Sequence, residues 1–253
     1  MSTDVEHRAG TVVAAFGLLL LAGCASRGTA DPDGGSSREA RPSETAATAD
    51  AAGTDPAAES AARADVISEI LAERRRGDYP EIEVLESGFT ITEQVQIRSD
   101  ARTDYERALA LLRQERYDEG ISILRGVVES TPDATAPYID LAIAYGRVGD
   151  LALAEESLGT AALLSPDNPI IHNELGIVYR KTGRFAEARA SYEQALTVFG
   201  NFHYARRNLA VLCDLYLADL DCALQNYRAY LDSVGGDPEV EIWVADIENR
   251  LGN

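Results

Sequence analysis

Two consecutive stretches decide the fold of this chain: residues 135–168, TAPYIDLAIAYGRVGDLALAEESLGTAALLSPDN, and residues 169–202, PIIHNELGIVYRKTGRFAEARASYEQALTVFGNF. They match at a spacing of 34 residues, which joins Tyr145 to Tyr179, Gly149 to Gly183, Ala154 to Ala188 and Ala161 to Ala195. A fixed period near this length is typical of helical hairpin arrays, because each hairpin has an apolar face that only a neighbour can cover. We therefore predict stacked hairpins that curve around a concave groove.

Within each unit, the spacing of small and aromatic residues resembles that of the tetratricopeptide repeat, whose pattern is W-x2-L-G-x2-Y…A-x3-F…P. The third unit carries this resemblance in Leu175, Gly176, Tyr179, Ala188, Tyr192 and Ala195, and the second in Leu141, Ala142, Tyr145, Ala154, Leu158, Ala161 and Pro166. The resemblance covers units 101–134, 135–168, 169–202 and 203–236. It implies an all-α, right-handed superhelix of about four hairpins that binds other proteins.

The two outer units depart from the pattern. In the first, Asp104 and Arg107 stand where large apolar residues are expected, as is common in a terminal repeat. In the fourth, Ala223 arrives one residue late, which predicts an insertion near 217–219. Residues 237–253 follow as a capping helix, with Asp237 as its N-cap. Trp243 is either the anchor of this cap or a contact for a partner.

The N-terminus predicts export and lipidation. Residues 9–22 form an apolar run of 14, which is too short to span a bilayer of about 30 Å and has the length of a signal-peptide core. The run ends in Leu21-Ala22-Gly23-Cys24, which resembles the bacterial lipobox. The resemblance implies that residues 1–23 are removed and that Cys24 is lipidated; the alternative is an ordinary secretory signal with a chance cysteine.

Two neighbouring features qualify this prediction. The stretch before the apolar run contains Asp4 and Glu6, so it lacks the basic character of a typical signal peptide. Ala25 follows the cysteine, and by resemblance to lipoprotein sorting this favours the outer membrane, facing the periplasm, over retention in the inner membrane.

The segment between the anchor and the repeats has two parts. Residues 24–62 are of low complexity and cannot bury enough apolar surface to offset their ordering entropy, so we expect a disordered tether. Residues 63–100 begin with helical spacing of apolar residues. They end in FTITEQVQI (89–97), which is either an extended strand or a strip lying on the first repeat.

The composition excludes some classes of function. The formal net charge is −19, which argues against nucleic-acid binding, and the acidity is better explained by solubility than by an acidic binding function. None of the three histidines, His7, His172 and His203, has a partner at metal-ligand spacing. No catalytic motif is present, so we expect neither an enzyme nor a cofactor or metal.

Cys213 and Cys222 remain as an even pair in what would be an oxidising compartment. They flank a predicted helix–helix turn and could form a disulfide if their Cα atoms lie within about 7 Å. Two small buried thiols are the alternative.

The first helix of each repeat should line the concave groove, as in the family that the chain resembles. The predicted groove residues are Arg113, Ile139, Ile143, Arg147, Ile170, Asn173, Ile177, Arg180, Lys181 and Arg207. Such cations would attract an acidic peptide or a carboxy-terminus through bidentate pairing. Ordinary solvated arginines are the alternative.

These features together favour a non-enzymatic, lipid-anchored periplasmic adaptor that binds a protein of an envelope machine. Pilus or secretion systems, outer-membrane assembly, TonB-linked transport and cell-wall synthesis are the candidate machines. A binding module for a small ligand or for peptidoglycan is the alternative, although aromatic residues are only 7% of the chain. The oligomeric state is left open.

Overall fold

A computed structural model describes residues 12–13, 56–73, 79–85, 88–93, 95 and 97–252. Its elements, in chain order, are β1 (Val12–Val13), α1 (Pro56–Glu73), β2 (Glu81–Leu85), β3 (Gly88–Glu93), α2 (Ser99–Arg113), α3 (Tyr117–Ser130), α4 (Thr135–Val148), α5 (Leu151–Leu164), α6 (Pro169–Lys181), α7 (Phe185–Val198), α8 (His203–Leu215), α9 (Leu220–Val234) and α10 (Pro238–Gly252). The signal peptide, Cys24, and residues 25–55 of the expected tether lie outside the described residues, apart from β1.

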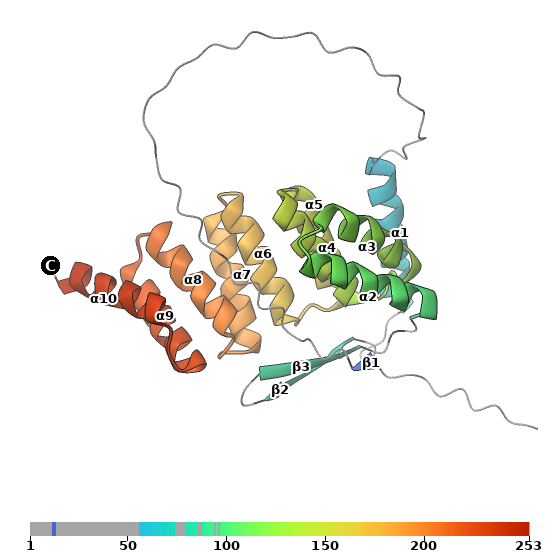
Figure 1. The fold of residues 1–253 in the computed structure, drawn as a ribbon. Coiled ribbons are helices and arrows are strands. Elements are labelled where there is room, and N and C mark those ends of the chain that lie inside the picture. Colours follow the sequence, from blue (N-terminus) through green and yellow to red (C-terminus); the bar gives the residue numbers. More distant parts are fainter. Residues whose placement is uncertain are drawn as a thin grey trace, which may run out of the picture.

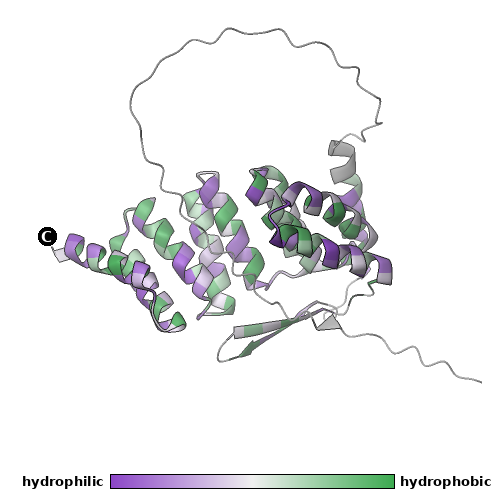
Figure 2. Ribbon diagram, in the orientation of Figure 1, coloured by the Kyte–Doolittle hydropathy of each residue, from purple (hydrophilic) through white to green (hydrophobic). Residues whose placement is uncertain are grey.

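Helices α2 to α9 pair as successive antiparallel hairpins, and α10 packs on α9 at the end of the array (Figure 1). This confirms the predicted all-α, right-handed superhelix with a terminal helix. Both hydrophobic and hydrophilic residues occur along each hairpin, as an amphipathic helix requires (Figure 2). Among the described residues, no helix is long and apolar enough to cross a membrane.

The turn inside each hairpin contains a residue in the left-handed region. These residues are Glu115 (φ 60°), Gly149 (φ 95°), Gly183 (φ 78°) and Ala218 (φ 53°). The first three are spaced by 34 residues and the last by 35. The fourth repeat therefore has one extra residue in this turn, where the late position of Ala223 predicted it.

Small residues let the two helices of a hairpin approach closely. In the third repeat, a Cβ atom at Gly176 would lie only 2.4 Å from the ring of Tyr192, which is fully buried. The equivalent pair in the second repeat is Ala142 and Leu158, both buried. A larger side chain on the second helix is thus matched by a smaller one on the first.

The chain before the repeats forms a helix and a small sheet. Helix α1 packs against α5, with Ile67 only 3% exposed and Arg63 paired to Glu156 at 3.5 Å. It begins at Pro56 and so includes residues 56–62, which were expected in the tether. The reason is local, since the alanine-rich stretch has high helix propensity and proline suits the first helical turn.

The sheet has strand order β1-β3-β2 and is antiparallel throughout. Within the β2–β3 hairpin, Glu81 pairs with Thr92 and Leu85 with Gly88, while β1 pairs with the last two residues of β3. The segment 89–97, left open between two interpretations, is thus a strand over residues 88–93.

The C-terminal helix closes the array as expected. Asp237 accepts hydrogen bonds from the backbone N–H groups of Glu239 and Val240, at 3.1 and 3.4 Å. The Trp243 ring lies 5.5 Å from the ring of Tyr227, which is buried in the last repeat. These contacts support the interpretation of Trp243 as the anchor of the cap.

Candidate partner-binding groove

A cavity of about 750 Å³ lies along the first helices of the repeats, α2, α4, α6 and α8. Side chains at equivalent positions of successive repeats form rows that run across these helices. Three such rows lie side by side. Because residues three, four and seven apart share one helix face, the three rows point to the same side of the array.

The first row is acidic and consists of Glu106, Asp140 and Glu174, spaced by 34 residues, and it continues into Asn208. The second row is apolar and consists of Leu109, Ile143 and Ile177, each three residues after an acidic one. The third row is basic and consists of Arg113, Arg147 and Lys181, each seven residues after an acidic one. Two helical turns, about 10 Å, separate the acidic row from the basic row.

The two inner carboxylates of the acidic row are partly buried at the floor of the cavity. The Tyr105 hydroxyl donates a hydrogen bond to Asp140, and the Asn173 amide donates one to Glu174 at 3.0 Å. Desolvation raises the pKa of Asp140 to about 6, against the Tyr105 hydrogen bond and the charge of Arg113, which lower it.

The pKa of Glu174 is raised to about 6 by the same cause. The Asn173 hydrogen bond and the charges of Arg147 and Lys181 oppose this rise. Among the described residues, neither Asp140 nor Glu174 forms an ion pair. The floor of the cavity therefore holds two carboxylates that feel nearby cations but form no ion pair with them among the described residues.

The end of β3 and the residues just after it border the cavity near the N-terminal ends of the helices, through Glu93, Val95 and Ile97. At one end, the Glu93 carboxylate accepts hydrogen bonds from the Thr135 hydroxyl and from its N–H group, the latter at 3.0 Å. This places an anion at the N-terminus of α4, where the helix dipole favours it. At the other end, the Phe89 ring packs edge-on against Phe199 and Phe202, at 5.4 and 5.5 Å.

Most of the residues predicted for the groove line this cavity. They are Arg113, Ile139, Ile143, Arg147, Ile170, Asn173 and Ile177. The structure brings these seven together from three consecutive first helices, so that they line one cavity.

Three of the predicted cations do not line the cavity. Arg180 packs 5.8 Å from the ring of Tyr216, and Arg207 lies 5.2 Å from the ring of Trp243 in the capping helix. Lys181 donates to the carbonyl of Gly146 at 2.8 Å, although it continues the basic row. Long side chains reach toward contacts that repeat spacing alone does not indicate, so their positions differ from the prediction.

Sequence reasoning missed the acidic row. Its signal was present in the chain, since Glu106, Asp140 and Glu174 recur at the repeat period. In a chain with a net charge of −19, however, carboxylates are common, and some of them are expected to lie close together by chance. Only the cavity shows that all three acids line the groove and that Asp140 and Glu174 are partly buried there, while Glu106 is exposed.

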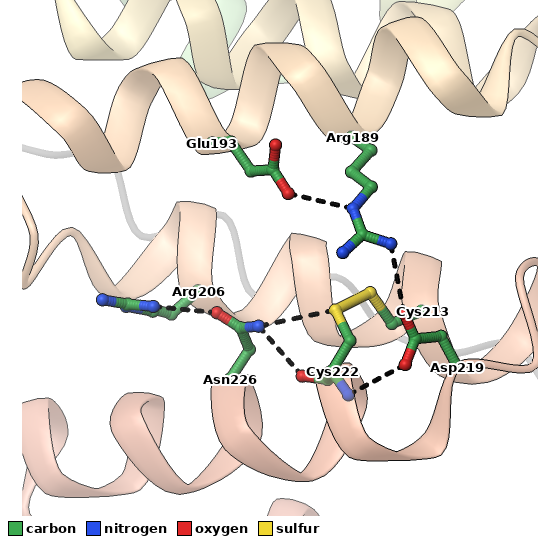
Figure 3. The surroundings of a disulfide bond; sticks show 7 residues. All are labelled: Arg189, Glu193, Arg206, Cys213, Asp219, Cys222 and Asn226. Carbon is green, nitrogen blue, oxygen red and sulfur yellow. Dashed lines mark hydrogen bonds and ion pairs between the residues drawn. A yellow bond between two sulfur atoms is a disulfide. The ribbon is translucent and has the colours of Figure 1, made fainter.

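Cys213 and Cys222 form a disulfide, with Cα atoms 5.9 Å apart. The bridge joins the end of α8 to the start of α9 across the longer turn of the fourth repeat (Figure 3). Asp219 caps α9 by accepting from the Cys222 N–H at 3.1 Å, and Arg189 of α7 reaches the same carboxylate at 3.1 Å. The disulfide therefore stabilises the turn that contains the insertion.

Comparison with known proteins agrees with this architecture. A tetratricopeptide repeat family profile matches residues 139–213. Similar solved structures include a tetratricopeptide protein of Thermus thermophilus, with 26% identity, a TM-score of 0.53, and coverage of 59% of this chain and 81% of that one. Another is pilF of Pseudomonas aeruginosa, with 19% identity, a TM-score of 0.55, and coverage of 59% and 68%.

MamA of Desulfovibrio magneticus RS-1 is also similar, with 15% identity, a TM-score of 0.55, and coverage of 62% of this chain and 88% of that one. The family match supports tetratricopeptide repeats over residues 139–213, and the likenesses to solved structures show the same fold for this chain. Its fold is that of a protein-interaction scaffold, a class that is generally non-catalytic.

Proposed function

We propose that this tetratricopeptide repeat protein is a lipid-anchored, non-enzymatic adaptor of the bacterial envelope, which binds an extended segment of a protein partner in the cavity along its first helices. The observation that carries the proposal is the cavity itself. Its apolar centre lies between two charged rows, and all three rows cross successive repeats. A groove of this kind suits a segment of chain that runs along the array.

The lipobox-like stretch ending at Cys24 supports an anchor in the outer membrane, on its periplasmic side. The disulfide between Cys213 and Cys222 is consistent with an oxidising compartment. A partner in pilus or secretion systems, outer-membrane assembly, TonB-linked transport or cell-wall synthesis would lie within reach of such an anchor.

In the groove, Arg113 and Arg147 are exposed at the rim and form no ion pair among the described residues. An acidic side chain or a carboxy-terminus of the partner would pair with them, while Ile143 and Ile177 offer an apolar surface beneath the bound segment. Arg113 and Arg147 are therefore the two predicted cations that line the cavity and could bind an acidic group of the partner.

The proposal is tested by crosslinking in intact cells that carry the full-length protein, followed by purification and mass spectrometry. We expect one envelope protein to dominate the crosslinked material. Its yield should fall in Cys24→Ala, which removes the anchor, and in the double variant Arg113→Gln with Arg147→Gln. The absence of any reproducible protein partner would refute the adaptor function.

A further inference from the structure

The acidic row is the feature of the groove that the proposed function does not yet explain. Glu106, Asp140 and Glu174 occupy one position of three successive repeats and all line the cavity. Core packing does not require them, because the equivalent residue in the fourth repeat is the neutral Asn208.

Keeping Asp140 and Glu174 at the cavity floor is unfavourable for the free protein. Each carboxylate is partly removed from water, and within the described part of the chain the one hydrogen bond that each accepts comes from a neutral donor, Tyr105 or Asn173. A desolvated carboxylate is stabilised far better by a cation than by a neutral donor. Along each helix the cations of the third row stand two helical turns, about 10 Å, further on. The charges of Arg113 and Arg147 act on Asp140 and Glu174 of the neighbouring helices, but no ion pair forms among the described residues.

We infer that the bound segment is an extended polypeptide of mixed charge, with lysine or arginine side chains on the acidic row and acidic side chains on Arg113 and Arg147. This inference rests on the proposed function and names the chemistry of the partner. The acidic row would bind basic side chains at one edge of the polypeptide, and the basic row would bind acidic side chains at the other edge. The apolar row would lie beneath the backbone of the polypeptide.

The geometry of an extended chain meets this requirement. Successive side chains of a strand point to opposite sides, so a strand that runs along the apolar row directs alternate side chains toward the two charged rows. Lysine and arginine have long apolar stems that can lie along Ile139 and Ile143 while their charged ends reach Asp140.

A compact cation fits the groove less well than a polypeptide. The acidic residues belong to three different repeats, so a small ligand would contact only part of the row. It would also leave the arginine row without a partner. The net charge of −19 attracts a basic segment from a distance, which assists the encounter before the local contacts form.

The test uses the full-length protein in detergent micelles and a displayed library of random peptides of about twelve residues, which span about 40 Å when extended. We expect the enriched peptides to combine basic and acidic residues at alternating positions. The most enriched peptide is then synthesised with a fluorescent label, and its Kd is measured by anisotropy.

Two double variants examine the rows separately. Asp140→Asn with Glu174→Gln should weaken binding of the labelled peptide about tenfold or more, and so should Arg113→Gln with Arg147→Gln. Replacing the lysines of the peptide by norleucine should weaken binding to the wild type and have little effect on the acidic-row variant. This non-additivity is the signature of a direct contact.

The matched control is Asp118→Asn with Glu129→Gln, which makes the same change in net charge at exposed positions on α3, outside the cavity. It should leave the Kd unchanged within about twofold. Enrichment of purely acidic, purely basic or uncharged peptides, or no enrichment at all, would overturn the inference. An equal loss in the control would also overturn it, because it would show a general charge effect.

Failure of this inference is distinguishable from failure of the adaptor function. If crosslinking identifies a partner and Asp140→Asn with Glu174→Gln does not reduce its yield, the adaptor function stands and the mixed-charge ligand is refuted. If no partner is found in cells although peptides of mixed charge bind, the groove chemistry stands and the adaptor function is refuted.

Discussion

Gly176 in α6 provides the most stringent test of how the repeats are packed. In Gly176→Ala, the new Cβ atom would lie 2.4, 2.6 and 2.8 Å from three ring atoms of Tyr192. The ring is rigid and its residue has no exposed surface, so it cannot move aside without shifting α7 against α6. We therefore expect a loss of stability at a position where alanine is the better helix former.

The expected magnitude is the difference between two opposing effects. Overpacking a close-packed interior costs about 1 to 3 kcal/mol, and contact with a rigid ring belongs at the upper end of this range. Alanine in place of glycine within a helix gains about 1 kcal/mol. The net loss in the free energy of unfolding should be about 2 kcal/mol, which lowers the midpoint of thermal unfolding by about 4 to 8 °C.

The assay is urea and thermal unfolding followed by far-ultraviolet circular dichroism. Gly159→Ala is the matched control, because this exposed glycine of α5 has no atom within 4 Å of the added Cβ. We expect it to stabilise the protein by about 0.5 to 1 kcal/mol. Opposite signs for the same substitution in two helices would show that contact with Tyr192 decides the outcome.

A double variant completes the test. Gly176→Ala with Tyr192→Leu recreates the pair that the second repeat has at Ala142 and Leu158. The two changes should compensate, so that the double variant is more stable than the sum of the single effects by at least about 1 kcal/mol. A neutral or stabilising Gly176→Ala, or strictly additive effects, would refute the packing argument.

Three further outcomes are expected. Cys213→Ser with Cys222→Ser should lower the free energy of unfolding by roughly 2 to 3 kcal/mol, because the bridge closes a loop with a sequence separation of 9. A reductant should destabilise the wild type but not the variant. If the reductant lowered the stability of both proteins equally, the result would contradict this prediction. Burial raises the pKa of Asp140 from 3.8 to about 6, so this carboxyl group binds a proton more tightly in the folded state than in the unfolded state. Its contribution to the free energy of unfolding is therefore lost as the pH rises from about 4 to about 6. Asp140→Asn should therefore be more stable than the wild type at pH 8, with an advantage that shrinks as the pH falls to 4, and an advantage independent of pH would argue against this. Phe89→Ala removes the edge-on ring contacts at one end of β3. Amide hydrogen exchange in residues 88–93 should therefore accelerate, while α4 to α9 keep their protection. Unchanged exchange in the strand would show that these ring contacts do not stabilise it.

The acidic row illustrates how far pattern reasoning reaches in a repeat protein. The 34-residue period and the resemblance to the tetratricopeptide repeat together predicted first helices on the concave face, and seven of the predicted residues line the cavity. The same period also places Asp140 and Glu174 there, yet periodicity alone does not distinguish a carboxylate at a cavity floor from one in solvent. That distinction depends on how closely neighbouring helices and β3 surround the position.

The sequence by itself determined the helical hairpins, their order, and the extra residue in the turn around Ala218, because helix periodicity and turn residues act between near neighbours in the chain. The tertiary structure alone decided that Cys213 and Cys222 are bridged, since the crossing of α8 and α9 sets their Cα atoms 5.9 Å apart. It also decided that the end of β3 borders the groove, through contacts such as that of Glu93 with Thr135, 42 residues away. Contacts between distant segments depend on where the folded array places them, and no pattern among near neighbours in the chain specifies those positions.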